Sequence, residues 1–208
     1  MLAPTVWATA PRFPLGPREA TVTATTDRAL LIEETTDGTF TRRVTERTLA
    51  ELPDHPVLIR VDWSSLNYKD ALSASGHRGV TRHYPHTPGI DAAGTVVASD
   101  DARLAPGQAV LVTGFDLGMN TPGGFGQHVR VPAEWVVPLP EGMSLHRSMQ
   151  WGTAGLTAGL AVQRLRQEVL PEQGPVLVTG ATGGVGSLAV GLLGKLGYTV
   201  AAVSGKPQ

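Results

Sequence analysis

Residues 176–203 read VLVTGATGGVGSLAVGLLGKLGYTVAAV, and this stretch decides the fold. The apolar run from Val176 to Thr179 predicts a short buried strand, and the glycine-rich turn after it predicts a sharp change of direction. Apolar residues then recur at helical spacing and predict one continuous buried stripe, made of Val185, Leu188, Ala189, Leu192, Leu193 and Leu196. A second strand, from Thr199 to Val203, follows Gly197. The unit is therefore a parallel crossover of strand, turn, helix and strand, which is an α/β arrangement.

The turn itself, Gly180-Ala-Thr-Gly183-Gly184-Val-Gly186, lies where dinucleotide-binding folds hold a pyrophosphate. Glycine allows a tight turn out of the strand and lets phosphate oxygens approach the backbone without meeting a Cβ atom. The helix start adds unpaired N–H groups and a partial positive charge. We therefore expect dinucleotide binding rather than a merely structural turn. The expected contacts are Thr182, Gly183, Gly184, Val185 and Gly186, although a hydrogen bond within the turn is an equal alternative for Thr182.

The end of the second strand indicates which cofactor binds. An NAD site carries Asp or Glu there to hold the ribose hydroxyls, whereas this strand ends in Ser204-Gly205-Lys206. A hydroxyl and an ammonium group attract a 2′-phosphate that a carboxylate would repel. We therefore predict NADPH, with Ser204, Gly205 and Lys206 among its contacts. The alternative is a solvated loop with an incidental lysine.

The sequence before this unit is rich in short strands separated by Pro and Gly turns. The predicted strands are Ala29–Ile32, Val57–Trp63, Gly94–Ala98, Ala109–Thr113, His128–Val131 and Trp135–Leu139. Helical patterns follow over Ser144–Trp151 and Thr153–Leu165. Residues 1–26 are Pro-rich without periodicity, and we expect a flexible N-terminal tail there.

Composition narrows the classes of function. The chain has 208 residues and a formal net charge of −1, so it offers no strongly basic face, and we expect no nucleic-acid partner. It contains no cysteine, which excludes disulfides, thiolate nucleophiles and thiolate-bound zinc. No apolar run approaches the ~20 residues that span a bilayer, so we expect no membrane partner and, by default, a cytoplasmic location.

Four motifs in order give the chain a family resemblance, which extends over about residues 27–206. They are Ser64-Ser-Leu-Asn67-Tyr68-Lys69-Asp70, Pro88-Gly89-Ile90-Asp91-Ala-Ala-Gly94-Thr-Val, Gly123-Gly124-Phe-Gly126 and Thr179-Gly180-Ala-Thr-Gly183-Gly184-Val-Gly186. With them the chain resembles the zinc-free, quinone-oxidoreductase-like branch of the medium-chain dehydrogenase/reductases, and most nearly the NADPH-dependent acrylyl-CoA reductase group.

This resemblance implies a GroES-like, β-rich catalytic domain over residues 27–145 and a Rossmann dinucleotide-binding domain over residues 146–208. It also implies hydride transfer from NADPH to the activated C=C bond of a small-molecule substrate, an enoyl thioester such as acrylyl-CoA. Full-length relatives are expected to be homodimers.

Departures from the zinc enzymes of the superfamily argue against a metal. Those relatives carry a cysteine ligand where this chain has Asn67, and His-Glu where it has Ile90-Asp91, and isoleucine cannot bind zinc. Three histidines fall near Asp91, but their spacings fit no standard ligand pattern. We expect them to be surface or turn residues, and they are His77, His83 and His86.

The resemblance also suggests which side chains lie nearest the nicotinamide, namely Tyr68 and Asn67. Tyr68 would hydrogen-bond the cofactor or hand on a proton; the alternative is a packed side chain whose hydroxyl is satisfied by backbone. Thr157 resembles a position that faces the cofactor, with a hydroxyl bonded to its own helix as the alternative. Asp70 is expected to order the loop or to cap a helix over Asp70–Ser73 rather than to react.

A complete dinucleotide-binding domain has two mononucleotide-binding halves, and only the first strand, helix and strand are recognisable here. We therefore expect a C-terminally truncated relative whose turnover, measured alone, is weak or absent. Alternatives to the enoyl-thioester reductase are an NADPH:quinone reductase, which shares every motif, and a truncated NADPH-binding pseudoenzyme or inactive fragment.

Overall fold

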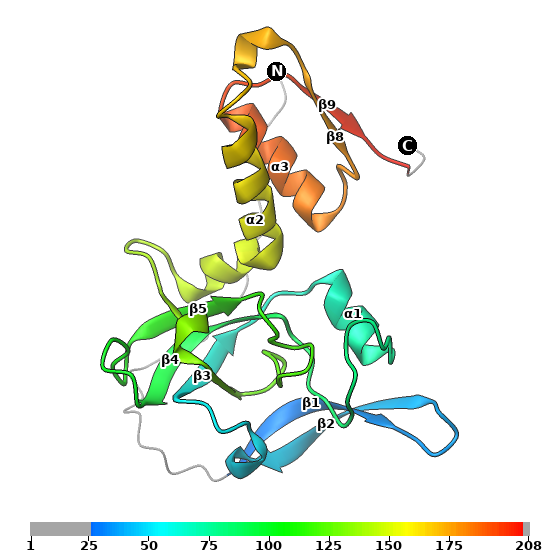
Figure 1. Ribbon diagram of the computed structural model, residues 1–208, viewed down its shortest axis with the longest axis vertical. Coiled ribbons are helices and arrows are strands. Elements are labelled where there is room, and N and C mark those ends of the chain that lie inside the picture. The colour runs from blue at the N-terminus through cyan, green and yellow to red at the C-terminus, as the bar shows by residue number, and fades with distance from the viewer. Residues whose placement is uncertain (1–25, 206–208) are drawn as a thin grey trace, which may run out of the picture.

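The structure is a computed structural model that describes residues 26–205. The predicted tail at residues 1–25 and the predicted contact Lys206 lie outside the described residues, whereas Thr26 begins the first strand. A β-rich body carries one long helix, which rises from it and packs against a smaller unit of one helix and two strands (Figure 1).

Strands β1 (Thr26–Glu34) and β2 (Phe40–Thr48) form an antiparallel hairpin, in which Thr26 pairs with Thr48. A short 3₁₀ helix, η1 (Leu49–Glu51), follows. Strand β1 contains the predicted Ala29–Ile32 but is longer, and β2 was not predicted at all. Its sequence, FTRRVTERT, lacks apolar alternation because nearly every side chain in it is exposed or half-buried.

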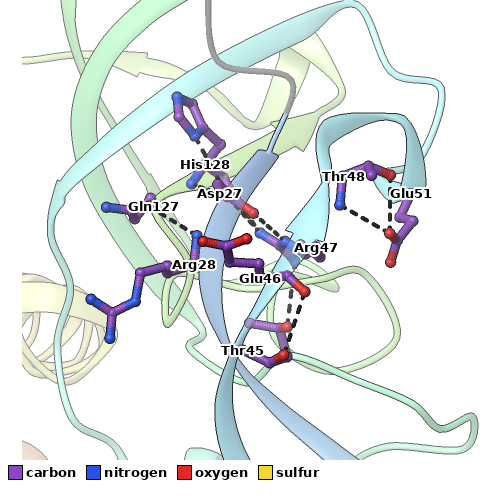
Figure 2. A network of polar contacts seen from close by, with 10 residues as sticks. Asp27, Arg28, Thr45, Glu46, Arg47, Thr48, Glu51, Gln127 and His128 are labelled. Carbon is purple, nitrogen blue, oxygen red and sulfur yellow. Dashed lines mark hydrogen bonds and ion pairs between the residues drawn. The ribbon is translucent and has the colours of Figure 1, made fainter.

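The exception in β2 is Arg47, which forms a buried ion pair with Asp27 of β1 (Figure 2). Its Nη2 also donates to the carbonyl oxygen of His128 at 2.7 Å, and the backbone N–H of His128 donates to Asp27 Oδ2 at 2.9 Å. Burial by itself would raise the pKa of Asp27, but the hydrogen bonds from His128 and Arg47 outweigh it, so that pKa is lowered. The pair thus ties the hairpin to the strand that contains His128.

That strand belongs to a five-stranded antiparallel sheet of order β6-β3-β4-β5-β7, which encloses the main apolar core. Its strands are β3 (Val57–Trp63), β4 (Asp91–Ser99), β5 (Ala109–Thr113), β6 (His128–Val131) and β7 (Val137–Pro138). The predictions for β3, β5 and β6 are confirmed residue for residue. Strand β4 begins earlier than predicted, and the predicted strand over Trp135–Leu139 is wrong in length, because Trp135 ends a 3₁₀ helix, η2 (Ala133–Trp135).

Helix α2 (Leu145–Leu165) connects the two parts of the molecule. It starts at Ser144, whose side chain accepts a hydrogen bond from the N–H of Arg147. At Gly152 the backbone has φ 49° and ψ −155°, so the helix is broken there into two segments. Their bounds agree with the two helical patterns in the sequence, and the break falls between them.

After a short 3₁₀ helix, η3 (Pro171–Gln173), the chain forms β8 (Val176–Thr179), α3 (Gly184–Lys195) and β9 (Val200–Val203). Strands β8 and β9 are parallel neighbours, which confirms the predicted crossover. Within the described part of the chain, no helix combines the length and the apolar character that crossing a bilayer requires.

The predicted buried stripe on α3 is wrong in extent. Leu193 is buried, but Leu188, Ala189 and Leu192 are only half-buried, and Val185 and Leu196 are 41% and 37% exposed. For Val185 and Ala189 the physical reason is an open apolar pocket of about 550 Å³ between α2, β8 and α3, which both help to line. Side chains that face this space lack the contacts of a closed core.

Candidate functional site

The first three of the four motifs meet in space at one residue, Asp91. Asp91, the first residue of β4, is fully buried. Its Oδ2 accepts a hydrogen bond from Asn67 Nδ2 at 2.8 Å, and its Oδ1 accepts from the backbone N–H of Thr153 at 3.0 Å and from the Thr153 hydroxyl at 2.7 Å. Asp91 therefore joins the Asn67 loop to the second segment of α2.

Thr153 was missed as a site residue by reasoning from the sequence, and Asp91 was noted in its motif, opposite the His-Glu of the zinc relatives and near the histidines, but was given no role. A signal for both exists. Asp91 opens a strand of buried residues, so its carboxylate needs donors. Thr153 follows Gly152 at the boundary of two helical patterns, where backbone N–H groups lack partners within the helix.

The glycine pair of the third motif packs against the same point. The N–H of Gly124 donates to the carbonyl oxygen of Gly89 at 2.8 Å. A Cβ atom on Gly124 would lie 2.2 Å from the carbonyl oxygen of Asp91, a carbonyl that also accepts the Ser64 hydroxyl at 2.6 Å. Only glycine fits position 124, since the clash would be with backbone.

Asp70 orders the loop, as predicted, but the helix that it caps starts earlier than expected. Helix α1 spans Tyr68–Ala74 rather than Asp70–Ser73, with Asn67 at its N-cap. Asp70 Oδ2 accepts the N–H of Asn67 at 2.7 Å, and Oδ1 accepts the N–H of Ile90 at 2.9 Å. Burial raises the pKa of this carboxyl despite both bonds.

The two residues proposed for the nicotinamide end differ in their surroundings. Asn67 is half-buried and donates one amide N–H to Asp91, and its side chain also interacts with Asp70 at the start of α1. Tyr68 is 80% exposed, and its hydroxyl has no hydrogen-bond partner among residues 26–205. The alternative of a Tyr68 packed against backbone therefore does not occur in this structure.

The glycine turn has the geometry that its sequence predicts. Gly180 has φ 61°, and the N–H of Gly183 donates to its carbonyl oxygen at 2.9 Å. A Cβ atom on Gly186 would lie 2.2 Å from that same oxygen. No side chain caps α3 at Gly183, and no acidic residue lies in its first turn. The amides of Gly184, Val185 and Gly186 therefore do not bind a carboxylate of the helix itself.

The end of β9 lies beside this turn. The hydroxyls of Thr182 and Ser204 are 3.4 Å apart, and the N–H of Ala181 donates to the carbonyl oxygen of Val203 at 3.1 Å. Gly205 follows directly and is exposed. The structure thus brings together the predicted phosphate contacts and the predicted 2′-phosphate contacts, with the exception of Lys206, which is not described.

Thr157 lies on an exposed face of α2 and bonds to its own helix. Its hydroxyl donates to the carbonyl oxygen of Thr153 at 2.8 Å, four residues earlier on α2, and its side chain is exposed. Helix α2 packs against α3, and at the turn the Ala154 Cβ lies 3.4 Å from where a Cβ on Gly184 would be.

The expectation for the histidines needs one correction. His77 and His83 are exposed, but His86 is buried, because its backbone pairs with Ile32 of β1. Burial lowers the pKa of His86, and its Nε2 has no hydrogen-bond partner among the described residues. Residues 26–205 contain no group of three or more His, Asp or Glu side chains arranged to hold a metal ion.

Comparison with known proteins identifies the relatives of this chain. The family model "Alcohol dehydrogenase GroES-like domain" matches residues 53–141. Acrylyl-CoA reductase AcuI of Ruegeria pomeroyi is 47% identical over 182 residues, which cover 86% of this chain and 55% of that protein. Putative quinone oxidoreductase YhfP of Bacillus subtilis is 50% identical over 159 residues, which cover 76% of this chain and 48% of that protein.

Solved structures agree with these matches. The yhdH oxidoreductase of Salmonella enterica, in complex with NADP, has a TM-score of 0.83 at 50% identity and covers 86% of this chain and 55% of that one. Bacillus subtilis yhfP with NAD bound has a TM-score of 0.84 at 46% identity and covers 88% and 56%. The chain spans about half the length of the curated relatives it matches. With its GroES-like domain and the start of a Rossmann unit, the chain belongs to the medium-chain dehydrogenase/reductase superfamily.

Proposed function

We propose that the chain is the NADPH-binding and acceptor-binding part of an oxidoreductase that transfers hydride to the activated C=C bond of an enoyl thioester such as acrylyl-CoA. The observation that carries the proposal is the uncapped, acid-free start of α3 behind a turn that admits only glycine at position 186. The identity of 47% to an acrylyl-CoA reductase supports the substrate class.

The residues present fit a phosphorylated dinucleotide. The amides of Gly184, Val185 and Gly186 would hold the pyrophosphate, because they belong to an uncapped helix start. Gly183 would contribute close approach rather than its N–H, which is bound to the Gly180 carbonyl oxygen. Thr182 and Ser204 would offer hydroxyls to the 2′-phosphate, together with Gly205 and Lys206. Residues 199–205 contain no carboxylate that would repel that phosphate, and NADP or NADPH is bound in the solved yhdH relatives.

At the other end of the site, the chain's own groups would bind the acceptor and stabilise charge. When bound, NADPH supplies the hydride. The phenol of Tyr68 and the side-chain amide of Asn67 would be the donors nearest the thioester oxygen, where they would stabilise negative charge. Tyr68 would alternatively hold the cofactor ribose or carboxamide, or deliver a proton, and Thr157 would lie along the cofactor on α2.

A quinone is the second candidate acceptor, favoured by the 50% identity to YhfP. Calorimetry with NADPH tests cofactor binding, and NADPH oxidation with acrylyl-CoA and with a quinone, side by side, tests the acceptor. Binding with faster turnover of acrylyl-CoA supports the proposal, and faster turnover of the quinone supports the alternative. Binding without turnover of either indicates a pseudoenzyme. Failure to bind NADPH contradicts the proposal as a whole.

A further inference from the structure

A continuous path of contacts connects Asn67 to the glycine turn, and its centre is the Asp91 carboxylate. Asn67 donates to one oxygen of this carboxylate, and Thr153 donates to the other through both its N–H and its hydroxyl. Helix α2 then packs against α3, and the Cβ of Ala154, the next residue, lies 3.4 Å from where a Cβ on Gly184 would be. The Asp91 contacts thus connect the two parts of the molecule at the point where the proposed site lies.

The break in α2 at Gly152 is held in place by contacts with Ser65 and Asp91. Before the break, the carbonyl oxygen of Met149 accepts the Ser65 hydroxyl at 2.7 Å. At the break, a Cβ on Gly152 would lie 2.5 Å from Ser65 Oγ and 2.6 Å from Asp91 Oδ2. The segment is therefore pressed directly against the Asn67 loop and the carboxylate, with no space for a side chain between them.

We propose that Asp91 is a positioning residue, which holds one amide N–H of Asn67 while it anchors the second segment of α2 and, through it, the glycine turn. This inference rests on the proposed function. Its consequence is that Asn67 and the pyrophosphate amides keep a fixed separation, so that a cofactor held by its phosphates places its nicotinamide against Asn67 and Tyr68. Such fixed placement is what hydride transfer requires.

The test uses Thr153→Val, which removes the hydroxyl donor and keeps the backbone N–H. Thr153→Ser retains the hydroxyl and should rescue the wild-type behaviour. Thr95→Val is the matched control. Thr95 is a half-buried residue of β4, the strand that begins at Asp91, and its hydroxyl also donates to a carboxylate oxygen, Asp62 Oδ2, at 3.3 Å. Asp91→Asn removes the carboxylate directly. If Asp91→Asn does not fold, the result for Thr153→Val still decides the test.

Two readouts are made on the full chain. The first is hydrogen exchange of the Asn67 side-chain amide by NMR, expected to be about tenfold faster in Thr153→Val, because the carboxylate that accepts this N–H is then held by one donor fewer. The second separates binding from turnover. The dissociation constant for NADPH should stay within about twofold, while kcat with acrylyl-CoA falls by about tenfold, as expected for lost positioning.

Each outcome decides something. Unchanged exchange at Asn67 in Thr153→Val overturns the inference, and so does unchanged kcat in a chain that turns over. An equal loss in Thr95→Val overturns it too, because the effect would then be general destabilisation. If the wild-type chain binds no NADPH, the proposed function fails on its own, and the exchange readout still decides whether Asp91 links Thr153 to Asn67.

Discussion

Arg47 and Asp27 face each other inside the protein as a two-point ion pair, with Nε 2.8 Å from Oδ1 and Nη2 3.2 Å from Oδ2 (Figure 2). Both side chains are almost entirely buried. A second pair joins the same two strands, Arg43 with Glu33, but it is exposed to solvent. The hairpin therefore has one buried and one exposed ion pair, whose contributions to stability can be compared.

Asp27→Ala should reduce the free energy of unfolding by about 3–5 kcal/mol, because it leaves a buried guanidinium without its partner. Urea denaturation followed by circular dichroism measures this. Glu33→Ala is the control and should leave the denaturation midpoint nearly unchanged, since that pair is exposed to solvent. Equal effects of the two substitutions would contradict the assignment of the Asp27 pair as a structural anchor.

His86 should make stability depend on pH. Burial lowers its pKa in the folded protein, and a hydrogen bond with the Gly118 backbone only partly offsets this. The unfolded chain therefore takes up the proton first, at about pH 6.5, and stability falls as the pH decreases from about 7 towards 5. The slope contributed by one such group is at most ~1.4 kcal/mol per pH unit. In His86→Gln this contribution should disappear, and persistence of the same slope would assign it to other groups.

Gly186→Ala should weaken NADPH binding by at least about tenfold, since its Cβ would lie 2.2 Å from the carbonyl oxygen of Gly180 and displace the turn. Gly191→Ala, on the same helix, is the control: a Cβ there meets nothing within 4 Å. It should leave binding unchanged and stabilise α3 by up to ~1 kcal/mol. Calorimetry with NADPH and a thermal melt of each variant give both results, and tight binding by Gly186→Ala would rule out the turn as the phosphate site.

Gly152→Ala should destabilise the protein by about 2 kcal/mol or more, because position 152 has φ 49° and a Cβ would collide with Ser65 and Asp91. Gly159→Ala, in the second segment of the same helix, has open space around its Cβ and should be neutral or stabilising. Chemical denaturation of both variants measures the contrast. If the two changes proved equally mild, the break at residue 152 would not be required.

Ser204→Asp should shift the cofactor preference from NADPH towards NADH. The new carboxylate at the end of β9 would repel a 2′-phosphate and accept hydrogen bonds from ribose hydroxyls. We expect the ratio of the two dissociation constants to change by about tenfold or more, which corresponds to ~1.4 kcal/mol. Ser204→Ala serves as the comparison because it removes the hydroxyl without adding charge. An unchanged ratio in Ser204→Asp would show that the 2′-phosphate lies elsewhere.

The elements that could be predicted are those whose signal is local. The glycine turn was predictable because Gly180 has φ 61° and a Cβ on Gly186 would meet the Gly180 carbonyl oxygen, so the requirement for glycine arises within the turn itself. The strands Val57–Trp63 and Ala109–Thr113 were predictable because apolar residues are concentrated in them between turn residues. The break in α2 was marked by Gly152 between two helical patterns.

The elements that could not be predicted depend on partners far away in the sequence. Strand β2 has no apolar period, since its one buried side chain is Arg47, held by Asp27 and by the carbonyl oxygen of His128. The role of Thr153 depends on a carboxylate that only the folded chain brings to it. The openness of the α3 face depends on the space beside it rather than on the helix itself.

The hydrogen bond from the Thr153 N–H to Asp91 also bears on the order of folding. The second segment of α2 restarts after Gly152, and the acceptor for its first amide comes from a strand 62 residues earlier. A helix usually receives such a cap from its own flanking residue, as the first segment does from Ser144. This segment can therefore reach its full stability only when strand β4 of the β-rich body has placed Asp91 beside it.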